Sequence, residues 1–409
     1  MKSYYIETFG CSSNQSHSEV MEGILAGNGF RPASKLEKAD VIVINSCIVK
    51  TPTENRIRER IRFIRKKYPE KKLVITGCAA DADIFRKIAP NAIFISSHDS
   101  GRIADFILKR KTKKGKRVRR NPFVGIVEIS SGCLGNCSYC IVRHARGALK
   151  SKPIDDVVNE VRNSLGDGCN EIWITSQDNS CYGRDIGSDL TLLLEKVISV
   201  KGNYRVRIGM MNPHHLTPYL DRLMKIYKDP KIFKFAHIPV QSGSDKILRL
   251  MNRKYSVEDF EKIVGNFRDA IEDIALSTDI IVGFPGETEE DFEKTLDLIE
   301  RIRPDVVNVS RFGARVGTRA SEMTPLHPGV VKNRSTRLAE LARRIGFEKN
   351  RDWIGRECKV FFNDRGSKKN QYVGRNESYK PVIVENKASL LGKTLKVKIT
   401  GAGLAYLSA

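Results

Sequence analysis

The stretch Cys133-Leu-Gly-Asn-Cys137-Ser-Tyr-Cys140 places three of the nine cysteines of this 409-residue chain within eight residues. It directly follows a predicted strand, residues 123–130, and ligands of β/α barrels bind at the carboxyl ends of strands. The next cysteine, Cys169, lies 29 residues further on, so an iron–sulfur cluster on these three thiolates would leave one iron open to a substrate. A structural zinc ion held by the three cysteines and His144 is the alternative.

The surrounding residues 121–349 repeat a strand–helix pattern that is typical of a β/α barrel. Amphipathic helices are predicted between the strands, for example over residues 154–165 and 291–301. Because the pattern supplies six strands, we expect a complete or a partial barrel. The predicted strands are residues 123–130, 171–176, 204–210, 235–240, 276–282 and 306–312.

The regions on either side of the barrel have patterns of their own. Residues 1–108 alternate strand and helix signals, which predicts an open α/β domain with a parallel sheet. Its strands are predicted at residues 3–8, 39–45, 72–76 and 92–96, and its clearest helix at residues 53–67. The last 60 residues alternate short strands and turns, which predicts a small β-barrel with strands at 357–363, 371–375, 380–385 and 394–400. The expected α/β protein therefore has domains at 1–112, 113–349 and 350–409.

A second group of cysteines shares one structural context. Cys11, Cys47 and Cys78 each lie just past the carboxyl end of a predicted strand of the first domain. In a parallel sheet these ends meet at one edge, where ligands usually bind. Gly10 and Gly77 precede two of the cysteines and allow the backbone to approach a bulky ligand. The pattern predicts a second three-cysteine metal site, and three unrelated buried cysteines are the alternative.

The net charge of the chain is +23, from 71 Lys and Arg against 48 Asp and Glu. Much of the excess lies in residues 109–120, with nine basic and no acidic residues, and in residues 350–409, with twelve basic and five acidic residues. This distribution favours a nucleic-acid partner. We expect residues 109–120 to be too charged to pack and to connect two domains, and a merely soluble basic linker is the alternative.

The sequence also predicts where the protein works. Its longest apolar runs have the length of strands, so no membrane partner is expected. The first residues lack the apolar core of a signal peptide. An odd number of cysteines without an export signal is typical of reduced cysteines that act as metal ligands or catalysts. We therefore expect a cytoplasmic location.

These residues resemble the methylthiotransferase family of radical S-adenosylmethionine (SAM) enzymes over the whole length of the chain. The cysteines of residues 133–140 match the CxxxCxxC motif of that superfamily, and the C-terminal region is similar to its RNA-binding TRAM domain. The other family motifs surround the N-terminal cysteines and one barrel strand: Thr8-Phe-Gly-Cys11-Ser-Ser-Asn14, Ile44-Asn-Ser-Cys47, Thr76-Gly-Cys78 and Thr278-Asp-Ile-Ile-Val-Gly-Phe-Pro-Gly-Glu287-Thr288.

The resemblance implies two 4Fe–4S clusters and SAM as cofactors. The cluster on Cys133, Cys137 and Cys140 is implied to bind SAM through its open iron and to cleave it reductively. The resulting 5′-deoxyadenosyl radical would remove the hydrogen from C2 of an adenine. The cluster on the three N-terminal cysteines is implied to hold the sulfur that is delivered as a methylthio group. The barrel pattern offers no paired carboxylates or Ser–His pair that would suggest acid–base catalysis instead.

Polar residues at the ends of barrel strands are further candidates within this resemblance. Each is a candidate contact to SAM or to the substrate, and a satisfied structural polar group is the alternative. The loop Gly283-Phe-Pro-Gly286 is expected to shape a tight turn beside SAM. The candidate contacts are Gln177, Asp178, His237, Gln241, Asp279 and Arg311.

Two segments, His144-Ala-Arg146-Gly147 and residues 171–187, look like the archaeal and eukaryotic tRNA branch of the family. This implies N6-threonylcarbamoyladenosine at position 37, in the anticodon loop of tRNA, as the substrate, with an electron donor and no DNA as partners. Arg146 is a candidate for binding the threonylcarbamoyl carboxylate. His17 departs from the acidic residue of many relatives. Two alternatives remain: the same chemistry on a ribosomal-protein aspartate, and a zinc-stabilised RNA-binding protein without enzymatic activity.

Overall fold

The computed structural model describes residues 2–49, 51–78 and 83–409. It divides into two compact units. The first unit consists of Met1–Arg120, Ile126–Gly135 and Cys140–Lys150, and the second of Asn121–Gly125, Asn136–Tyr139 and Ser151–Ala409. The chain therefore passes between the units several times around the CxxxCxxC stretch.

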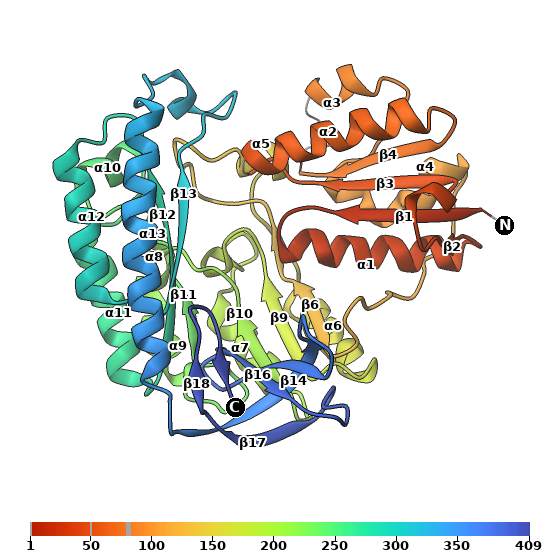
Figure 1. Cartoon of the computed structure of the whole chain (residues 1–409). Coiled ribbons are helices and arrows are strands. Elements are labelled where there is room, and N and C mark those ends of the chain that lie inside the picture. The colour runs from red at the N-terminus through yellow and green to blue at the C-terminus, as the bar shows by residue number, and fades with distance from the viewer. Residues whose placement is uncertain (1, 50, 79–82) are drawn as a thin grey trace. The chain divides into compact units, whose positions relative to one another are not determined.

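The first unit is built on a parallel five-stranded sheet with helices on both faces (Figure 1). Its elements are β1 Ser3–Thr8, α1 Ser12–Gly27, β2 Arg31–Pro32, β3 Val41–Ser46, α2 Thr51–Lys67, β4 Lys72–Gly77, α3 Asp83–Ile88, β5 Ile93–Phe94, α4 Ile103–Leu108, β7 Ser130–Ser131 and α5 Val142–Arg146. Ile42 and Ile44 of β3 pack with α2, and Val41 and Val43 pack with α1. This alternation along one strand gives the sheet an apolar core on each face, as the sequence predicts for an open α/β domain.

Five of the six predicted barrel strands lie in the second unit, and the sixth, β6, begins there and ends in the first unit. They form two parallel sheets with the orders β10-β9-β6 and β11-β12-β13. The backbone N–H of Met211 donates to the carbonyl of His237 over 2.9 Å and links the two sheets at β10 and β11. All six predicted strands are present, and the barrel is partial. Their bounds are β6 Val124–Glu128, β9 Glu171–Thr175, β10 Arg205–Ile208, β11 Phe235–His237, β12 Ala275–Val282 and β13 Val306–Arg311.

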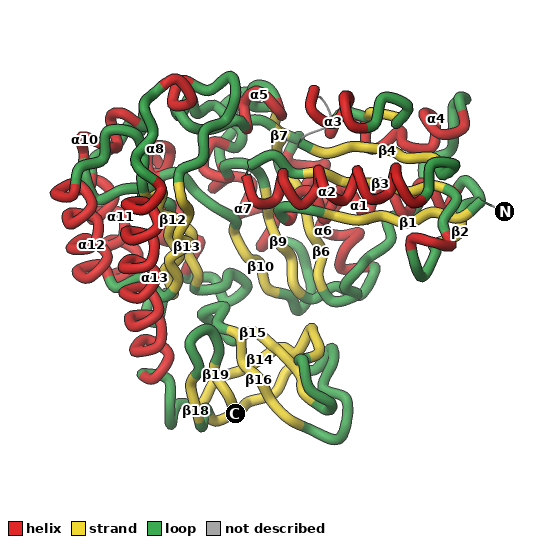
Figure 2. Tube along the Cα trace, turned by 45° about the horizontal axis from the view of Figure 1, so that its top comes forward, coloured by secondary structure: helices red, strands yellow, loops and turns green. Residues whose placement is uncertain are grey.

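Helices cover the outer face of these strands. In both views α11, α12 and α13 run side by side next to β12 and β13 (Figures 1 and 2). Their apolar stripes face the strands, for example through Phe260, Phe292 and Leu338, which are fully buried. A short strand, β8 Lys150–Ser151, comes before the helices. The helices are α6 Ile154–Gly166, α7 Leu190–Ile198, α8 Pro213–Leu216, α9 Leu220–Tyr227, α10 Asp245–Leu250, α11 Val257–Ala270, α12 Glu289–Ile302 and α13 Pro328–Arg351.

The C-terminal residues form a curled six-stranded sheet with the order β17-β14-β15-β16-β19-β18 (Figure 2). The four predicted strands are present as β14 Glu357–Arg365, β15 Gln371–Arg375, β16 Pro381–Glu385 and β17 Thr394–Lys398, and β18 Gly401–Ala402 and β19 Leu407–Ser408 are additional. A register shift between Phe362 and Asp364 bends β14. Val360, Phe362 and Val382 fill the core that the curl encloses. The prediction of a small β-barrel is confirmed as a half-barrel.

This sheet is joined to the barrel within the second unit by buried contacts. Lys380 Nζ lies 2.6 Å from Asp305 Oδ1, and the two side chains are 7% and 5% exposed. The Tyr379 ring packs against Phe233 and Phe235 at centroid distances of 4.8 and 5.2 Å. The C-terminal sheet therefore forms part of the packing of the second unit.

The basic residues 109–120 are irregular in structure, but they pack along α1 within the first unit. The backbone N–H of Val118 donates to the Glu19 carbonyl over 3.2 Å. Arg120 Nη2 lies 2.7 Å from a Glu22 carboxylate oxygen, and Arg119 Nη1 lies 3.6 Å from Glu19. The prediction that this run is too charged to pack is wrong, because α1 supplies carboxylates that neutralise its second half.

Candidate functional site

The three N-terminal cysteines follow neighbouring strands at one edge of the first unit's sheet. Strands β1, β3 and β4 are adjacent and parallel, so the loops that begin with Cys11, Cys47 and Cys78 lie side by side. Cys11 is exposed, Cys47 is buried and Cys78 is intermediate. Gly10 has φ +99°, and a Cβ atom there would lie 2.7 Å from the Cβ of Cys47. Gly10 therefore allows the close approach of the first two cysteine loops.

The charges of the three sulfur atoms act on one another. Burial, with a smaller effect of negative charge on Cys78 and Cys11, raises the pKa of the Cys47 thiol to about 11. Burial also raises the pKa of Cys78, against the effect of the nearby Arg146 guanidinium. The three cysteines lie in adjacent loops at one edge of the sheet, with the Arg146 cation beside Cys78, and so offer the sulfur donors that an iron–sulfur cluster binds as thiolates.

Arg146 lies inside this cluster of residues. Its guanidinium donates to Cys78 Sγ over 3.2 Å, to Asn14 Oδ1 over 2.8 Å and to Glu128 Oε1 over 3.3 Å. The residue is 2% exposed. Burial alone would lower the pKa of Arg146, but the charges of Cys78 and Glu128 outweigh it and raise it. Each of the three guanidinium nitrogens thus donates within the protein, which favours a role of Arg146 inside this cluster of residues over the predicted binding of a substrate carboxylate.

His17 extends the same network. Its Nε2 atom lies 2.8 Å from Glu128 Oε2, and both side chains are largely buried. Glu128 thus binds Arg146 with one oxygen and His17 with the other. The sequence marks His17 only as a departure from its relatives, and the structure places it three contacts away from Cys78.

The CxxxCxxC loop contributes cysteines to both units. Cys133 and Cys140 belong to the first, where Cys133 Sγ accepts the backbone N–H of Gly135 over 3.2 Å. Cys137 belongs to the second, where its Sγ accepts a hydrogen bond from Arg253 Nη1 over 3.4 Å. All three side chains are partly accessible. Within residues 2–49, 51–78 and 83–409, no three His, Cys, Asp or Glu side chains are gathered as a site for a single metal ion.

Two of the six candidate contacts in the barrel are brought together. His237 Nε2 on β11 lies 3.1 Å from Asp279 Oδ1 on β12. Asn308 Nδ2 on β13 donates to the same oxygen over 2.8 Å. Three neighbouring strands therefore present one polar cluster. Asn308 has no special signal in the sequence, apart from its place in the alternating pattern of a predicted strand.

The other candidates have different surroundings. Asp178 is buried, and its Oδ1 accepts the backbone N–H groups of Ser180 and Asn212. Gln177 Oε1 is buried and lacks a hydrogen-bond partner among the described residues, as does Asp178 Oδ2. Gln241 is buried with φ +74°, and Arg311 is held by Ser335 Oγ over 2.8 Å.

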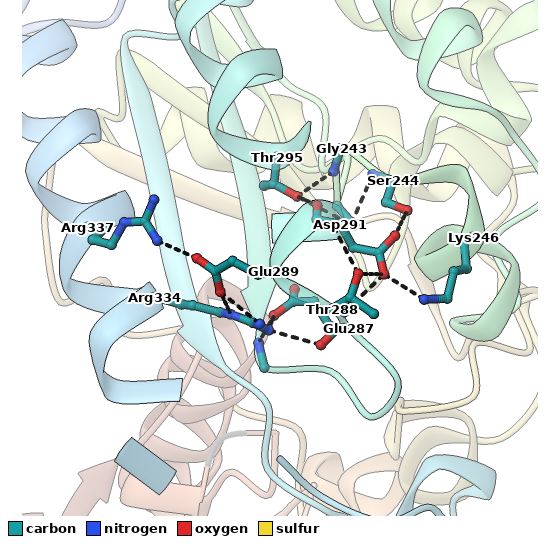
Figure 3. A network of polar contacts seen from close by, with 12 residues as sticks. Gly243, Ser244, Lys246, Glu287, Thr288, Glu289, Asp291, Thr295, Arg334 and Arg337 are labelled. Atoms are coloured by element: carbon teal, nitrogen blue, oxygen red, sulfur yellow. Dashed lines mark hydrogen bonds and ion pairs between the residues drawn. The ribbon is translucent and has the colours of Figure 1, made fainter. Parts of the chain in front are cut away.

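The family motif of residues 278–288 ends in a buried polar network, which Figure 3 shows. Glu287 Oε2 accepts the backbone N–H of Gly283 over 2.9 Å and a hydrogen bond from Arg334 Nη1 over 2.7 Å. Asp291, at the start of α12, accepts hydrogen bonds from Lys246 and Thr288. These contacts fix the tight loop between β12 and α12. Glu287 therefore stabilises this loop through its hydrogen bonds to Gly283 and Arg334.

No helix of the described residues is both long and apolar enough to cross a membrane. Three family models match separate parts of the chain: the radical SAM superfamily at residues 127–299, the uncharacterized protein family UPF0004 at residues 3–94 and the TRAM domain at residues 351–409.

Two curated relatives resemble the chain over nearly its whole length. The probable threonylcarbamoyladenosine tRNA methylthiotransferase of Methanothermobacter thermautotrophicus is 39% identical, over 99% of this chain and 98% of the relative. The threonylcarbamoyladenosine tRNA methylthiotransferase of Xenopus laevis is 35% identical, over 98% of this chain and 76% of the relative. A solved structure of TsrM, a radical S-adenosylmethionine methyltransferase from Kitasatospora setae, has the same fold with a TM-score of 0.56, 14% identity and coverage of 78% and 77%.

Proposed function

The chain belongs to the radical SAM family of threonylcarbamoyladenosine tRNA methylthiotransferases, and we propose that it adds a methylthio group to C2 of threonylcarbamoyladenosine at position 37 of tRNA. The observation that carries this proposal is the match to a named relative over 98–99% of both chains. The alternatives of a ribosomal-protein aspartate and of a zinc-stabilised RNA-binding protein have no support among these relatives.

In this proposal Cys133, Cys137 and Cys140 would hold one 4Fe–4S cluster, beside which SAM would bind, and the three N-terminal cysteines would hold a second cluster. When bound, these groups supply the radical chemistry that breaks an unactivated C–H bond, which acidic and basic side chains do not break. The protein orients the reactants and excludes water. Its polar groups for that task are the unpartnered Gln177 amide oxygen and the cluster of His237, Asp279 and Asn308, with Asp178, Gln241 and Arg311 in supporting positions.

We assign three regions to three tasks. Residues 1–112 hold the second cluster, residues 113–349 hold the SAM cluster and residues 350–409 bind the anticodon region of tRNA. The target base lies in a single-stranded loop, so it can be read without opening a duplex. An external electron donor and a cytoplasmic location, which the reduced cysteines favour, complete the proposal.

The test compares tRNA that carries the threonylcarbamoyl group with the same tRNA lacking it. A site that forms hydrogen bonds with this group should reject unmodified adenosine strongly, because its buried polar partners would be left unpaired. Mass spectrometry of nucleosides should detect the 2-methylthio product only from the modified tRNA. Protein with Cys133, Cys137 and Cys140 replaced by Ala serves as the control. Equal conversion of both tRNAs would refute the substrate, and no conversion of either by the active protein would refute the function.

A further inference from the structure

We propose that Arg146 is a positioning residue of the second cysteine site, which holds the three cysteine loops in register and supplies positive charge beside Cys78. The inference rests on the proposed second cluster, because it concerns how the chain supports that group. It assigns to the second cysteine site a side chain that lies close to the CxxxCxxC segment in the sequence, six residues after Cys140.

The first argument is geometric, and it passes through Asn14. The Asn14 amide nitrogen donates to the Phe9 carbonyl over 2.7 Å and to the Ser46 carbonyl over 2.8 Å. These carbonyls precede Cys11 and Cys47, so one side chain joins the first two loops. Arg146 binds the remaining oxygen of Asn14 and the sulfur of Cys78. The Asn14–Arg146 pair therefore ties all three cysteine loops to one another.

The second argument concerns charge. A cluster held by thiolates adds negative charge to a buried site, and hydrogen bonds to its sulfur atoms help to set its reduction potential. The side chain of Arg146 is 1% exposed, so its charge is weakly screened by water. Reduction adds one more electron to the cluster, and a buried cation at this distance favours the reduced form. Loss of the cation should make the potential more negative.

The third argument concerns the choice of arginine. The planar guanidinium donates in three separate directions, to a sulfur, an amide oxygen and a carboxylate. The compact ammonium of lysine keeps the charge but loses the fixed fork. Glu128 accepts a hydrogen bond from the Arg146 guanidinium with one carboxylate oxygen and contacts His17 with the other, so it fixes the orientation of the guanidinium. Lysine at position 146 should therefore preserve the charge effect better than the loop geometry.

The experiment uses full-length protein with Cys133, Cys137 and Cys140 replaced by Ala, so that only the second site is loaded. Arg146→Gln and Arg146→Lys are compared with Arg143→Gln, which removes the same charge from an exposed position of α5. After reconstitution without oxygen, the measurements are iron content, circular dichroism and a redox titration followed by electron paramagnetic resonance. The parent and the Arg143→Gln control should hold about four irons and share one midpoint potential.

The expected result is that Arg146→Gln holds iron with a more negative midpoint potential and that Arg146→Lys falls between it and the parent. Loss of iron from Arg146→Gln in a protein with normal circular dichroism also supports a positioning role. An unchanged potential at full iron content overturns the inference, as does general misfolding of both variants. Failure of the parent to bind iron would instead refute the second cluster of the proposed function.

Discussion

Arg253 donates from Nη1 to the Sγ atom of Cys137 over 3.4 Å, and it is anchored behind by Tyr255 and the Pro239 carbonyl. Burial would lower the pKa of Arg253, but Tyr139, Tyr255 and Cys137 outweigh it and raise it well above its usual range. Cys137 in the second unit thus has an arginine beside its sulfur, as Cys78 has in the first unit. The two cysteine sites share this device without sharing any sequence around it.

Replacing Arg253 should affect the CxxxCxxC cluster alone. In protein with the three N-terminal cysteines changed to Ala, Arg253→Gln should shift the midpoint potential to more negative values and slow reductive SAM cleavage, because a cation beside the sulfur is lost. Redox titration and the yield of 5′-deoxyadenosine provide the measurement. Arg249→Gln, an exposed position of α10, is the control. Identical potentials in both variants would contradict the prediction.

Reconstituted protein should hold about eight irons, as two four-iron clusters. Changing Cys133, Cys137 and Cys140 to Ala should leave about four irons and abolish SAM cleavage. Changing Cys11, Cys47 and Cys78 should also leave about four, while SAM still yields 5′-deoxyadenosine without methylthio product. Iron analysis and product chromatography measure both effects. Stoichiometric zinc, with no uptake of iron, would exclude two iron–sulfur clusters.

The first half of the basic run should bind tRNA phosphates. Lys109, Arg110, Lys111 and Lys114 are exposed, whereas Arg120 is paired with Glu22. Changing these four exposed residues to Ser should flatten the slope of log K against log salt by roughly 3, at about 0.7–0.9 per phosphate. Binding isotherms across a salt series test this. A slope equal to that of the parent protein would remove the run from the tRNA-binding surface.

Breaking the buried pair of Lys380 and Asp305 should destabilise the second unit. Lys380→Met leaves a buried carboxylate without its cation, which costs about 3–5 kcal/mol. Lys380→Met combined with Asp305→Leu should recover most of that loss, because no charge stays unpaired. Chemical unfolding of the apoprotein measures both variants.

Removing residues 350–409 should impair SAM cleavage as well as tRNA binding, because the buried contacts between the C-terminal sheet and the barrel would be lost.

Asp291 should support the start of α12 in a pH-dependent way. Burial raises its pKa, but hydrogen bonds from Lys246, Thr288 and Ser244 outweigh burial and hold the pKa well below the usual 3.8. Its contribution is therefore complete above pH 3.8 and disappears as the pH falls through the lower pKa of the folded state. Asp291→Ala should cost about 2 kcal/mol in unfolding free energy at pH 7.

Urea unfolding at pH 7 and at low pH tests this expectation. Glu290→Ala is the matched control, since its ion pair with Lys294 is exposed and should contribute less than about 0.5 kcal/mol. The difference between Asp291→Ala and the parent should shrink at low pH. A constant difference at both pH values would show that the charge of Asp291 contributes nothing.

Periodicity was sufficient to predict the elements with long apolar patterns. Ile57, Ile61 and Ile64 recur at helical spacing and are fully buried in α2, and the barrel strands carry continuous apolar runs. The two-residue strands β2, β8, β18 and β19 were not predicted, because two residues carry no periodicity, whereas β5 lies within the longer apolar stretch predicted at residues 92–96. Such short strands form because the backbone of a neighbouring strand offers hydrogen-bond partners, and not because of their own residues.

The supporting contacts of the candidate site could not be predicted in the same way. Cysteine spacing and strand ends indicate the metal sites, because both signals are local. The partner of Arg146 most distant in the sequence, Asn14, lies 132 positions from it, and Arg253 lies 116 positions from Cys137. The prediction for residues 109–120 failed for the same reason, since Glu19 and Glu22 are about 100 positions away.

The contact between Gly115 and Gly23 has a consequence for the susceptibility of the chain to proteases. A Cβ atom on Gly115 would lie 1.9 Å from the Gly23 carbonyl oxygen, so two backbones meet there without side chains between them. A trypsin-like protease binds its substrate as an extended segment. A segment whose backbone packs directly against α1 cannot adopt that conformation without first detaching, so it resists cleavage. Nicking should concentrate at residues 109–114, although residues 116–120 contain as many cleavable bonds for their length.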